Sequence, residues 1–316
     1  MHYSHRKPAR VFLNPRCNRN TGVSRWNKIS PDIVDQIGEC VVENIISTEG
    51  MAEKVLMSYN KGERRFVAAG GDGTVHLLIN AVLAAGLDIE EITFGAVGLG
   101  SSNDFHKPFR RESMIRGAPV RLNFENAAKC DLMQIDYIDE GGQKATRFCI
   151  LNASIGITAE ANAYFNLRSR LLNTLQRLSV EAAIVAAALR SIFLFQNLPC
   201  IIRVDGGPKK DFMITNLGII KNPHFSGALC YDTSIEPDDG KLGVFLCYDQ
   251  CIRERISCLT AIYLRRFLKS EKTTCLEARH VLIRSKHVFA LEMDGEVLET
   301  SQAEFTVLPK KVRFCR

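Results

Sequence analysis

Residues 66–74 read Phe-Val-Ala-Ala-Gly-Gly-Asp-Gly-Thr, a short apolar run followed by a loop with three glycines and one carboxylate. The apolar run predicts a buried strand. The stretch after Thr74 is amphipathic, because its apolar residues recur three and four positions apart, as on a core-facing helix. Gly86 follows at a position suited to end that helix. The glycines therefore lie on a predicted strand-to-helix turn. The apolar helix positions are Val75, Leu78, Ile79, Val82 and Leu83.

A turn of this kind suits a phosphate group. Glycine lets the backbone approach a bulky ligand closely, and the N–H groups at a helix start attract anions. A carboxylate at Asp72 disfavours a bare anion, but it fits when Mg²⁺ accompanies the phosphate. We therefore expect Asp72 to bind Mg²⁺ and the surrounding backbone to bind phosphate. A tight loop with an acidic tip is the alternative. The expected phosphate-binding residues are Gly70, Gly71, Asp72, Gly73 and Thr74.

A second loop, residues 98–105, reads Gly-Leu-Gly-Ser-Ser-Asn-Asp-Phe. After Gly100, the hydroxyls of Ser101 and Ser102 can donate to phosphate oxygens. Asn103 and Asp104 either lock the loop or face the acceptor substrate. An ordinary polar turn before a helix is the alternative.

The first third of the chain alternates strand-like and helix-like segments, which predicts a mostly parallel sheet with helices on both faces. Ligands of such sheets bind beyond the carboxyl ends of the strands. Asn14, Thr48 and both glycine loops follow predicted strands, so we expect them to converge on one crevice. From about residue 120, short β-like runs predict an antiparallel β domain, with a helical insertion over 169–196. The runs are 120–123, 133–138, 147–154, 200–205, 211–220 and 242–247.

Composition is that of an ordinary globular protein with two domains. Of 316 residues, 46% are apolar and 24% charged, and the net charge is +6. This mild excess suits anionic lipid or nucleotide, but solvated lysines and arginines explain it equally well. Eleven cysteines without a CxxC pair indicate reduced thiols rather than zinc. No secretory signal or spanning segment is evident, so we expect a cytoplasmic protein.

Taken together, the Gly-Gly-Asp-Gly-Thr loop and the later loop ending in Asn-Asp-Phe resemble the diacylglycerol kinase catalytic domain. That superfamily includes bacterial soluble lipid kinases, ceramide kinases and sphingosine kinases. Nearly the whole chain takes part in the resemblance. The further matching segments are Asn14-Pro15, Thr48, Asp131, residues 152–159, residues 237–242 and Asp294-Gly295-Glu296.

The resemblance implies a fold and a reaction. An α/β nucleotide domain like that of NAD kinases would span residues 1–122, rejoined by 301–316, and an antiparallel β-sandwich for the lipid would span 123–300. The implied activity is transfer of phosphate from ATP, with Mg²⁺, to the hydroxyl of diacylglycerol or a related lipid. Asn14 and Pro15 would contact the nucleotide, as would Thr48.

The second domain supplies three acidic residues by the same resemblance. Glu296 would accept the proton of the lipid hydroxyl, and Asp131 would orient Glu296 or the metal. Asp239, with backbone carbonyls, would hold a structural Mg²⁺. From the residues alone, Glu296 reads equally as a carboxylate on an Asp-Gly hairpin turn, and Asp239 as part of a solvated turn.

Two other functions stay open. An NAD kinase shares the first glycine loop, and a catalytically degenerate nucleotide- or lipid-binding regulator would fit the departures from the family pattern at Leu77 and Leu99. The sequence does not name the lipid or the preferred nucleotide.

The expected partner is lipid at a membrane surface, contacted peripherally, and not a nucleic acid. The arginines around the apolar insertion would meet lipid head groups, or would simply extend from a packed helix. A homodimer is an open alternative. These arginines are Arg168, Arg170, Arg177 and Arg190.

Overall fold

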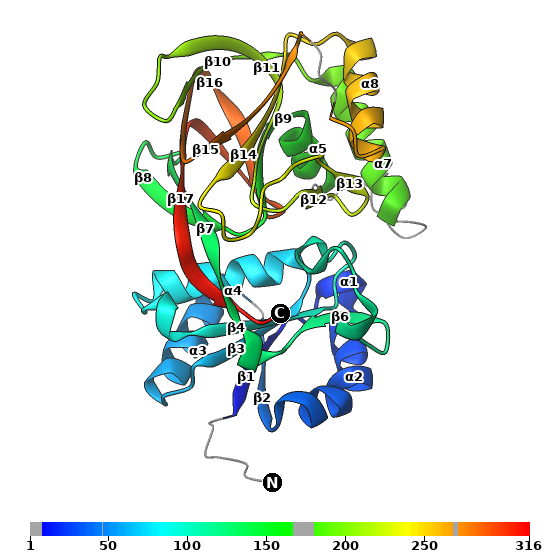
Figure 1. Cartoon of the computed structure of the whole chain (residues 1–316), viewed down its shortest axis with the longest axis vertical. Coiled ribbons are helices and arrows are strands. Elements are labelled where there is room, and N and C mark those ends of the chain that lie inside the picture. Colours follow the sequence, from blue (N-terminus) through cyan, green and yellow to red (C-terminus); the bar gives the residue numbers. More distant parts are fainter. Residues whose placement is uncertain (1–7, 46, 167–179, 268–270) are drawn as a thin grey trace. The chain divides into compact units, whose positions relative to one another are not determined.

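A computed structural model describes residues 8–45, 47–166, 180–267 and 271–316 (Figure 1). The chain divides into two compact units. The first comprises residues 1–130 together with 310–316, and the second comprises residues 131–309. Two strands, β7 (Ala128–Ile138) and β17 (Glu296–Phe314), run through these boundaries. The chain thus passes between the units within strands, several residues beyond the limits expected from sequence.

The first unit is built on a parallel sheet with the strand order β2-β1-β3-β4. Beyond β4 lie the antiparallel strand β6 and the parallel end of β17. The strands are β1 (Ala9–Leu13), β2 (Cys40–Asn44), β3 (Arg65–Gly70), β4 (Thr93–Gly98), β5 (Met114–Ile115) and β6 (Ala118–Arg121). The helices are α1 (Cys17–Asn20), α2 (Gly22–Ile37), α3 (Thr48–Asn60) and α4 (Asp72–Ala84).

Alternation along the strands sends side chains to two apolar cores. On one face Val11 and Val67 pack with Trp26 and Ile33 of α2. On the other face Phe12 meets Phe66 edge to face, with ring centroids 5.5 Å apart; α3 and α4 lie on this side in Figure 1. The predicted α/β layer is confirmed. Gly86, with φ +68°, follows the end of α4, where only glycine adopts this conformation without strain.

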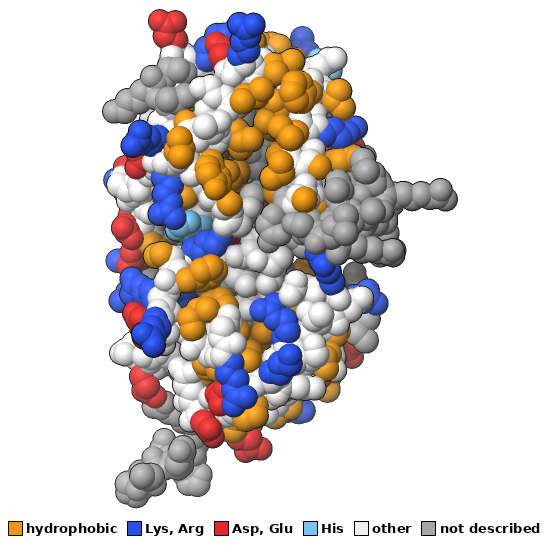
Figure 2. Space-filling view, turned by 90° about the vertical axis from the view of Figure 1, so that its right-hand side faces the viewer, with side chains coloured by type: hydrophobic (Ala, Val, Ile, Leu, Met, Phe, Trp, Pro, Cys, Tyr) orange, Lys and Arg blue, Asp and Glu red, His pale blue; other side chains and the backbone are white. Residues whose placement is uncertain are grey.

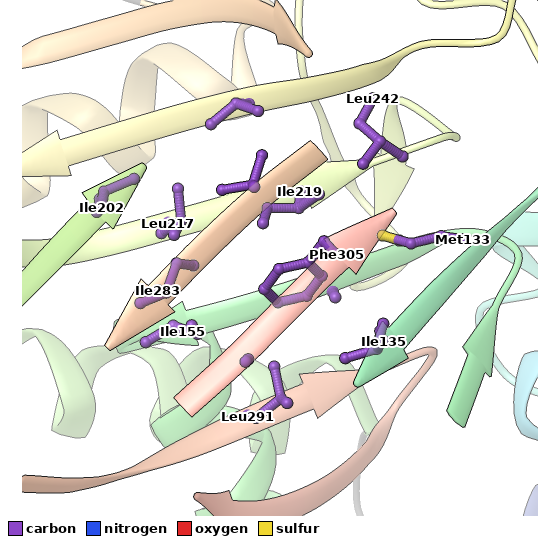
Figure 3. Packing of buried hydrophobic residues seen from close by; sticks show 14 of the residues in the cluster. Met133, Ile135, Ile155, Ile202, Leu217, Ile219, Leu242, Ile283, Leu291 and Phe305 are labelled. Carbon is purple, nitrogen blue, oxygen red and sulfur yellow. The ribbon is translucent and has the colours of Figure 1, made fainter. Parts of the chain in front are cut away.

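The second unit is antiparallel. Its strand order is β15-β14-β11-β10-β16-β17, with β9 pairing β11 and β16, and β7 pairing β17 and β8. Figure 3 shows side chains from several of these strands turned toward one another, among them Ile155, Leu217, Ile283 and Phe305. All four are buried in one core. The predicted antiparallel β domain is therefore confirmed.

The remaining elements of this unit are as follows. The strands are β8 (Lys144–Cys149), β9 (Asn152–Gly156), β10 (Leu198–Val204), β11 (Lys210–Ile220), β12 (His224–Phe225), β13 (Leu229–Cys230), β14 (Leu242–Tyr248), β15 (Thr273–Ala278) and β16 (His280–Met293). The helices are α5 (Ile157–Asn166), α7 (Val180–Leu194) and α8 (Ile252–Tyr263).

One expectation for this unit was wrong in detail, and two long strands were missed. The single strand expected over 147–154 is two strands, β8 and β9, because the N–H groups of Ile150 and Leu151 donate to the carboxylate of Asp294 instead of a neighbouring strand. The long strands β16 and β17 were not expected, because polar residues break their apolar pattern. Their pairing also shifts register between Arg284 and Phe289.

Candidate functional site

The two glycine loops lie side by side at the carboxyl ends of β3 and β4. Gly70 and Gly98 are register partners. Beyond them, the N–H groups of Leu99 and Gly100 donate to the carbonyl oxygen of Gly70, at 2.7 and 3.2 Å. A Cβ on Gly100 would lie 2.5 Å from the Cα of Gly71, which is closer than atoms can pack. Glycine at this position is therefore required for the loops to touch, and the predicted convergence of the two loops is observed.

Asp72 joins the loops as an acceptor. It begins α4, and its two carboxylate oxygens accept the N–H groups of Asp104 and Phe105, at 3.0 and 2.9 Å. Hydrogen bonds to a charged acceptor are the stronger kind. The carboxylate that the sequence offered as a metal ligand thus fixes the second loop to the first.

The second loop is further closed by its own side chains. Asn103, in the left-handed region at φ +50°, accepts from the N–H of Gly100 at 3.0 Å and donates to its carbonyl at 3.1 Å. Asp104 is buried and pairs with the ammonium of Lys107 at 2.6 Å. Of the two roles the sequence left open for these residues, locking the loop describes the observed contacts.

Other groups at this edge face outward. Ser101 is exposed and Ser102 is half-buried. Gly71 is the N-cap of α4 and makes no side-chain cap hydrogen bond. The N–H of Thr74 donates to the carbonyl oxygen of Gly71 at 2.9 Å, but the N-cap supplies no side chain to the first turn of α4. A helix start of this kind attracts phosphate.

Asn14 also reaches this edge. Its backbone N–H donates to the carbonyl of Ala69 at 2.9 Å, and its Nδ2 lies 3.4 Å from the hydroxyl of buried Thr74. Pro15 follows it and is half-buried. Thr48 begins α3, but its side chain is outside the described part of the chain. The structure thus unites Asn14 with the first glycine loop, and the nucleotide contact expected for Thr48 stays a prediction.

Sequence reasoning missed two residues beside these loops. Arg25 of α2 donates to the carbonyl oxygens of Leu99 and, at 3.3 Å, of Gly100. His106 is buried, and among the described residues its Nδ1 has no hydrogen-bond partner. Burial, reinforced by the charge of Arg121, lowers the pKa of His106 to about 3. Arg25 lies outside any recognisable motif. His106 gave one signal, its place directly after the Asn-Asp-Phe motif.

In the second unit, the Asp-Gly-Glu segment forms the turn between β16 and β17. Asp294 (φ +48°) and Gly295 (φ +93°) occupy the turn, as the hairpin interpretation of these residues predicted. The buried carboxylate of Asp294 accepts the N–H groups of residues 150–152 at 2.9 to 3.1 Å. Glu296, by contrast, is exposed at the start of β17. Within this motif Asp294 therefore holds residues 150–152, Gly295 completes the turn, and Glu296 is an accessible acid.

The other two predicted acids of this unit meet at a lysine. Asp131 and Asp239 contact the ammonium of Lys221 at 2.8 and 2.7 Å. Burial raises the pKa of Asp239, but the bonds from Lys221 and from two backbone N–H groups outweigh burial, so that this pKa lies below its ordinary value. The resemblance assigned Asp239 and nearby carbonyl oxygens to a structural Mg²⁺, but here these oxygens contact the ammonium of Lys221. Across the described residues, no group of three His, Cys, Asp or Glu side chains is placed to hold a metal.

A cavity of about 310 Å³ lies in the second unit between α5, α7 and β16. Its wall combines apolar side chains, among them Leu194, Val288 and Phe289, with the charged side chains of Glu160 and Arg190. Arg190 stacks over the ring of Tyr164 at 4.1 Å.

The fold defines a protein of two units, an α/β unit that carries the paired glycine loops and an antiparallel β unit. Residues 8–135 match the diacylglycerol kinase catalytic domain, and residues 153–316 match the YegS C-terminal NAD kinase beta sandwich-like domain. The chain therefore belongs to the diacylglycerol kinase catalytic domain superfamily, a class of lipid kinases.

Curated relatives support this family, and a solved structure supports the fold. The chain is 19% identical to a Bacillus subtilis protein named "Putative lipid kinase YtlR", over 96% of this chain and 97% of that one. It is 22% identical to a Staphylococcus epidermidis "Putative lipid kinase", over 77% of this chain and 74% of that one. A solved diacylglycerol kinase from Bacillus anthracis strain Sterne superposes with a TM-score of 0.66 at 14% identity, covering 99% of this chain and 97% of that one. This solved structure supports the fold.

Proposed function

We propose that this protein transfers the terminal phosphate of ATP, with Mg²⁺, to the hydroxyl of diacylglycerol or a related lipid. The observation that carries the proposal is the pairing of the two glycine loops at the uncapped start of α4. Phosphoryl transfer needs in-line positioning and stabilisation of charge more than covalent help from the protein. Backbone N–H groups near Gly71, with the hydroxyls of Ser101 and Ser102, would bind the phosphates.

The metal would bind mainly through the nucleotide. Mg²⁺ commonly takes one or two carboxylates together with phosphate oxygens, and it would neutralise charge on the transferred group. Asp72 is the carboxylate within the first glycine loop. Both its oxygens already accept an N–H group, so any metal ligation by Asp72 would use their remaining lone pairs.

Glu296 is the proposed general base. It is exposed, so a lipid hydroxyl can reach it, whereas Asp294 and Glu292 of the same hairpin are buried among hydrogen-bond donors. A carboxylate that accepts several hydrogen bonds is a poor proton acceptor. The geometry therefore favours Glu296 over Asp294 and Glu292 of this hairpin.

The test is a transfer assay with ATP labelled at the terminal phosphate. Diacylglycerol, a ceramide-type lipid and NAD are offered separately, with and without Mg²⁺. We expect Mg²⁺-dependent label in a lipid product. Label in NAD instead would assign the NAD kinase alternative, and ATP binding without transfer to any of the three would favour a regulator.

We further propose that the protein meets its lipid at a membrane surface through α7 and α8. The two helices are neighbours, because Arg255 of α8 donates to the carbonyls of Ile192 and Phe195 at 2.9 and 2.8 Å. Figure 2, viewed from the side where α7 and α8 lie in Figure 1, shows hydrophobic side chains gathered over this unit. Large exposed apolar side chains recur along both helices. They are Val185, Leu189, Phe193 and Leu194 in α7, and Ile252, Ile256 and Tyr263 in α8.

An anionic bilayer suits this surface. Arg190, Arg253 and Arg265 are exposed on or beside the same helices, and each basic side chain near an anionic surface contributes about 1 kcal/mol. Of the arginines expected to meet lipid, Arg190 lies on α7, whereas Arg168, Arg170 and Arg177 lie outside the described residues. None of the described helices is long and apolar enough to cross a bilayer.

Co-sedimentation with anionic vesicles tests this surface. The double variant Phe193→Ser and Leu194→Ser should bind vesicles more weakly, because these side chains are 55% and 62% exposed and apolar. Met57→Ser, which replaces a 52% exposed side chain of α3, is the matched control and should bind as wild type. Equal binding by all three proteins would contradict the proposed surface.

A further inference from the structure

Lys221 directly follows β11, and its ammonium is buried among four oxygen atoms. Nζ lies 2.8 Å from Oδ2 of Asp131 and 2.7 Å from Oδ1 of Asp239. The carbonyl oxygens of Glu236 and Lys241 each lie 2.7 Å away. The side chain of Lys221 is 2% exposed and that of Asp131 is 0% exposed. A buried lysine is retained only when its charge is compensated in this way.

The surrounding turn is folded around the ammonium. Asp239 accepts the N–H groups of Glu236 and Lys241 at 3.0 and 2.9 Å, which closes the turn over residues 236–241. The N–H of Gly240, at φ +71°, donates to Asp131 Oδ2 at 2.7 Å. The N–H of Asp131 in turn donates to the carbonyl of Pro237 at 2.7 Å. Asp131 is thus fixed to the turn from both its backbone and its side chain.

The same oxygens would otherwise form a site for a hard cation. Two carboxylates and two carbonyls are the ligand type that Ca²⁺ and Mg²⁺ prefer. Their distances of 2.7 to 2.8 Å to the nitrogen are those of hydrogen bonds, whereas Mg²⁺ needs oxygens at about 2.0–2.1 Å. The ammonium also occupies the centre of the cluster and would repel a second cation. The residues present therefore do not fit a structural metal at Asp239.

We propose that Lys221 is a built-in cation that takes the place of a structural metal in this turn and positions Asp131. The second unit then keeps its acidic turn folded without divalent ions, and its stability does not depend on Mg²⁺ or Ca²⁺. The inference does not rest on the proposed reaction, because it concerns stability and metal binding in the absence of nucleotide and lipid.

The wild-type protein provides the first test. Its melting temperature, measured without nucleotide, should be the same in EDTA as in millimolar Mg²⁺ or Ca²⁺, to within about 1 °C. A clear rise with either ion that EDTA abolishes, together with one ion bound per chain by calorimetry, would overturn the proposal. This measurement needs no variant and so does not depend on one folding.

The Lys221→Met variant provides the second test, because methionine keeps the apolar stem and removes the charge. The variant should melt lower than wild type, since the buried carboxylate of Asp131 and the partly exposed carboxylate of Asp239 lose their partner. Unlike wild type, it should bind Ca²⁺ and recover at least about 3 °C in melting temperature, as a ligand that binds only the folded state stabilises it. A folded Lys221→Met protein that binds no Ca²⁺ would contradict the proposal.

Two further variants sharpen the result. Lys241→Met removes an exposed ammonium of the same turn, which pairs with Glu277 at 2.5 Å, and it should respond to Ca²⁺ as wild type does. The double variant Lys221→Met and Asp239→Asn has one carboxylate fewer, so its burial cost is lower, and it should lose the Ca²⁺ response. A Ca²⁺ response that persists in the double variant would place the ion elsewhere and count against the proposal.

Discussion

Asp72 of the first unit and the pair Asp131 and Asp239 of the second unit are held in different ways. In the first unit, Asp72 accepts two backbone N–H groups from the neighbouring loop, so its charge orders backbone. In the second unit, Asp131 and Asp239 converge on the ammonium of Lys221, so their charge is balanced by a side chain. Asp72, Asp131 and Asp239 all come from recognisable motifs, and in both arrangements their contacts stabilise the fold. Glu296, from the last such motif, is instead exposed.

This contrast indicates where chemistry and stability reside. A carboxylate with several donors stabilises the fold and holds its proton weakly, whereas an exposed carboxylate is accessible to a substrate hydroxyl. Replacing the satisfied acids should therefore mainly affect stability. Replacing the exposed acid should mainly affect turnover.

The largest effect is expected for Glu296→Gln. The amide keeps the shape but cannot accept a proton, so turnover should fall by about 10²–10⁴-fold, with ATP affinity and melting temperature unchanged. Glu299→Gln, an exposed acid of the same strand, is the control and should retain turnover. Steady-state assays decide it; activity within about threefold of wild type would show that the base is another residue.

Asp294→Asn should lower the free energy of unfolding by about 3 kcal/mol. The carboxylate accepts three backbone N–H groups, and an amide that turns its NH₂ toward them leaves buried donors unpaired. Denaturant unfolding measures this directly. An unchanged midpoint would show that the turn tolerates the loss and that Asp294 is not the anchor of residues 150–152.

Asp72→Asn should loosen the second glycine loop. A hydrogen bond to a charged acceptor contributes about 1.5–3 kcal/mol, so the amides of Asp104 and Phe105 should exchange with solvent at least about tenfold faster. Asp88→Asn, which alters a local contact to the N–H of Glu90, should leave them protected. The Mg²⁺ concentration needed for half-maximal turnover separates the two roles: it rises if Asp72 also binds metal and stays constant if Asp72 only holds the loop.

The next prediction concerns pH and His106. Its pKa is about 3 in the folded protein and about 6.5 when unfolded. Below pH 6.5 the unfolded chain binds a proton that the folded protein does not, so stability is lost as pH falls toward 3. Between pH 6 and 4 this loss amounts to about 1.4 kcal/mol per pH unit. His106→Phe should flatten the slope by that amount; identical slopes for both proteins would contradict a buried neutral His106.

Much of the first unit could be predicted from sequence. Its strands are short apolar runs, α4 has a regular apolar stripe, and the glycine loops follow the strands directly. Only the fold class of the second unit, an antiparallel β domain, could be predicted. The register of β16 and β17 depends on long-range pairing that no local sequence pattern encodes. The break at Ile150 and Leu151 depends on Asp294, more than 140 residues away.

The site shows the same limit. Motifs located Asn14, the glycine loops and the acids, but they did not tell which acids are satisfied by the fold. Lys221 belongs to no motif that we recognised. Its role depends on the turn over residues 236–241, which lies 15 to 20 residues later in the chain. Arg25 likewise reaches the loop only through the packing of α2. Residue types indicated the chemistry, and tertiary contacts decided which residues remain accessible to perform it.

The central claim is that the paired glycine loops bind the phosphates of ATP, and Gly100→Ala tests it most directly. The added methyl group would meet Gly71 at 2.5 Å and force the loops apart. Titration calorimetry should show a Kd for ATP with Mg²⁺ raised by about tenfold or more, with adenosine binding much less affected. Gly141→Ala, on an exposed turn of the second unit, should bind both ligands as wild type does. Unchanged ATP affinity in Gly100→Ala would contradict the account.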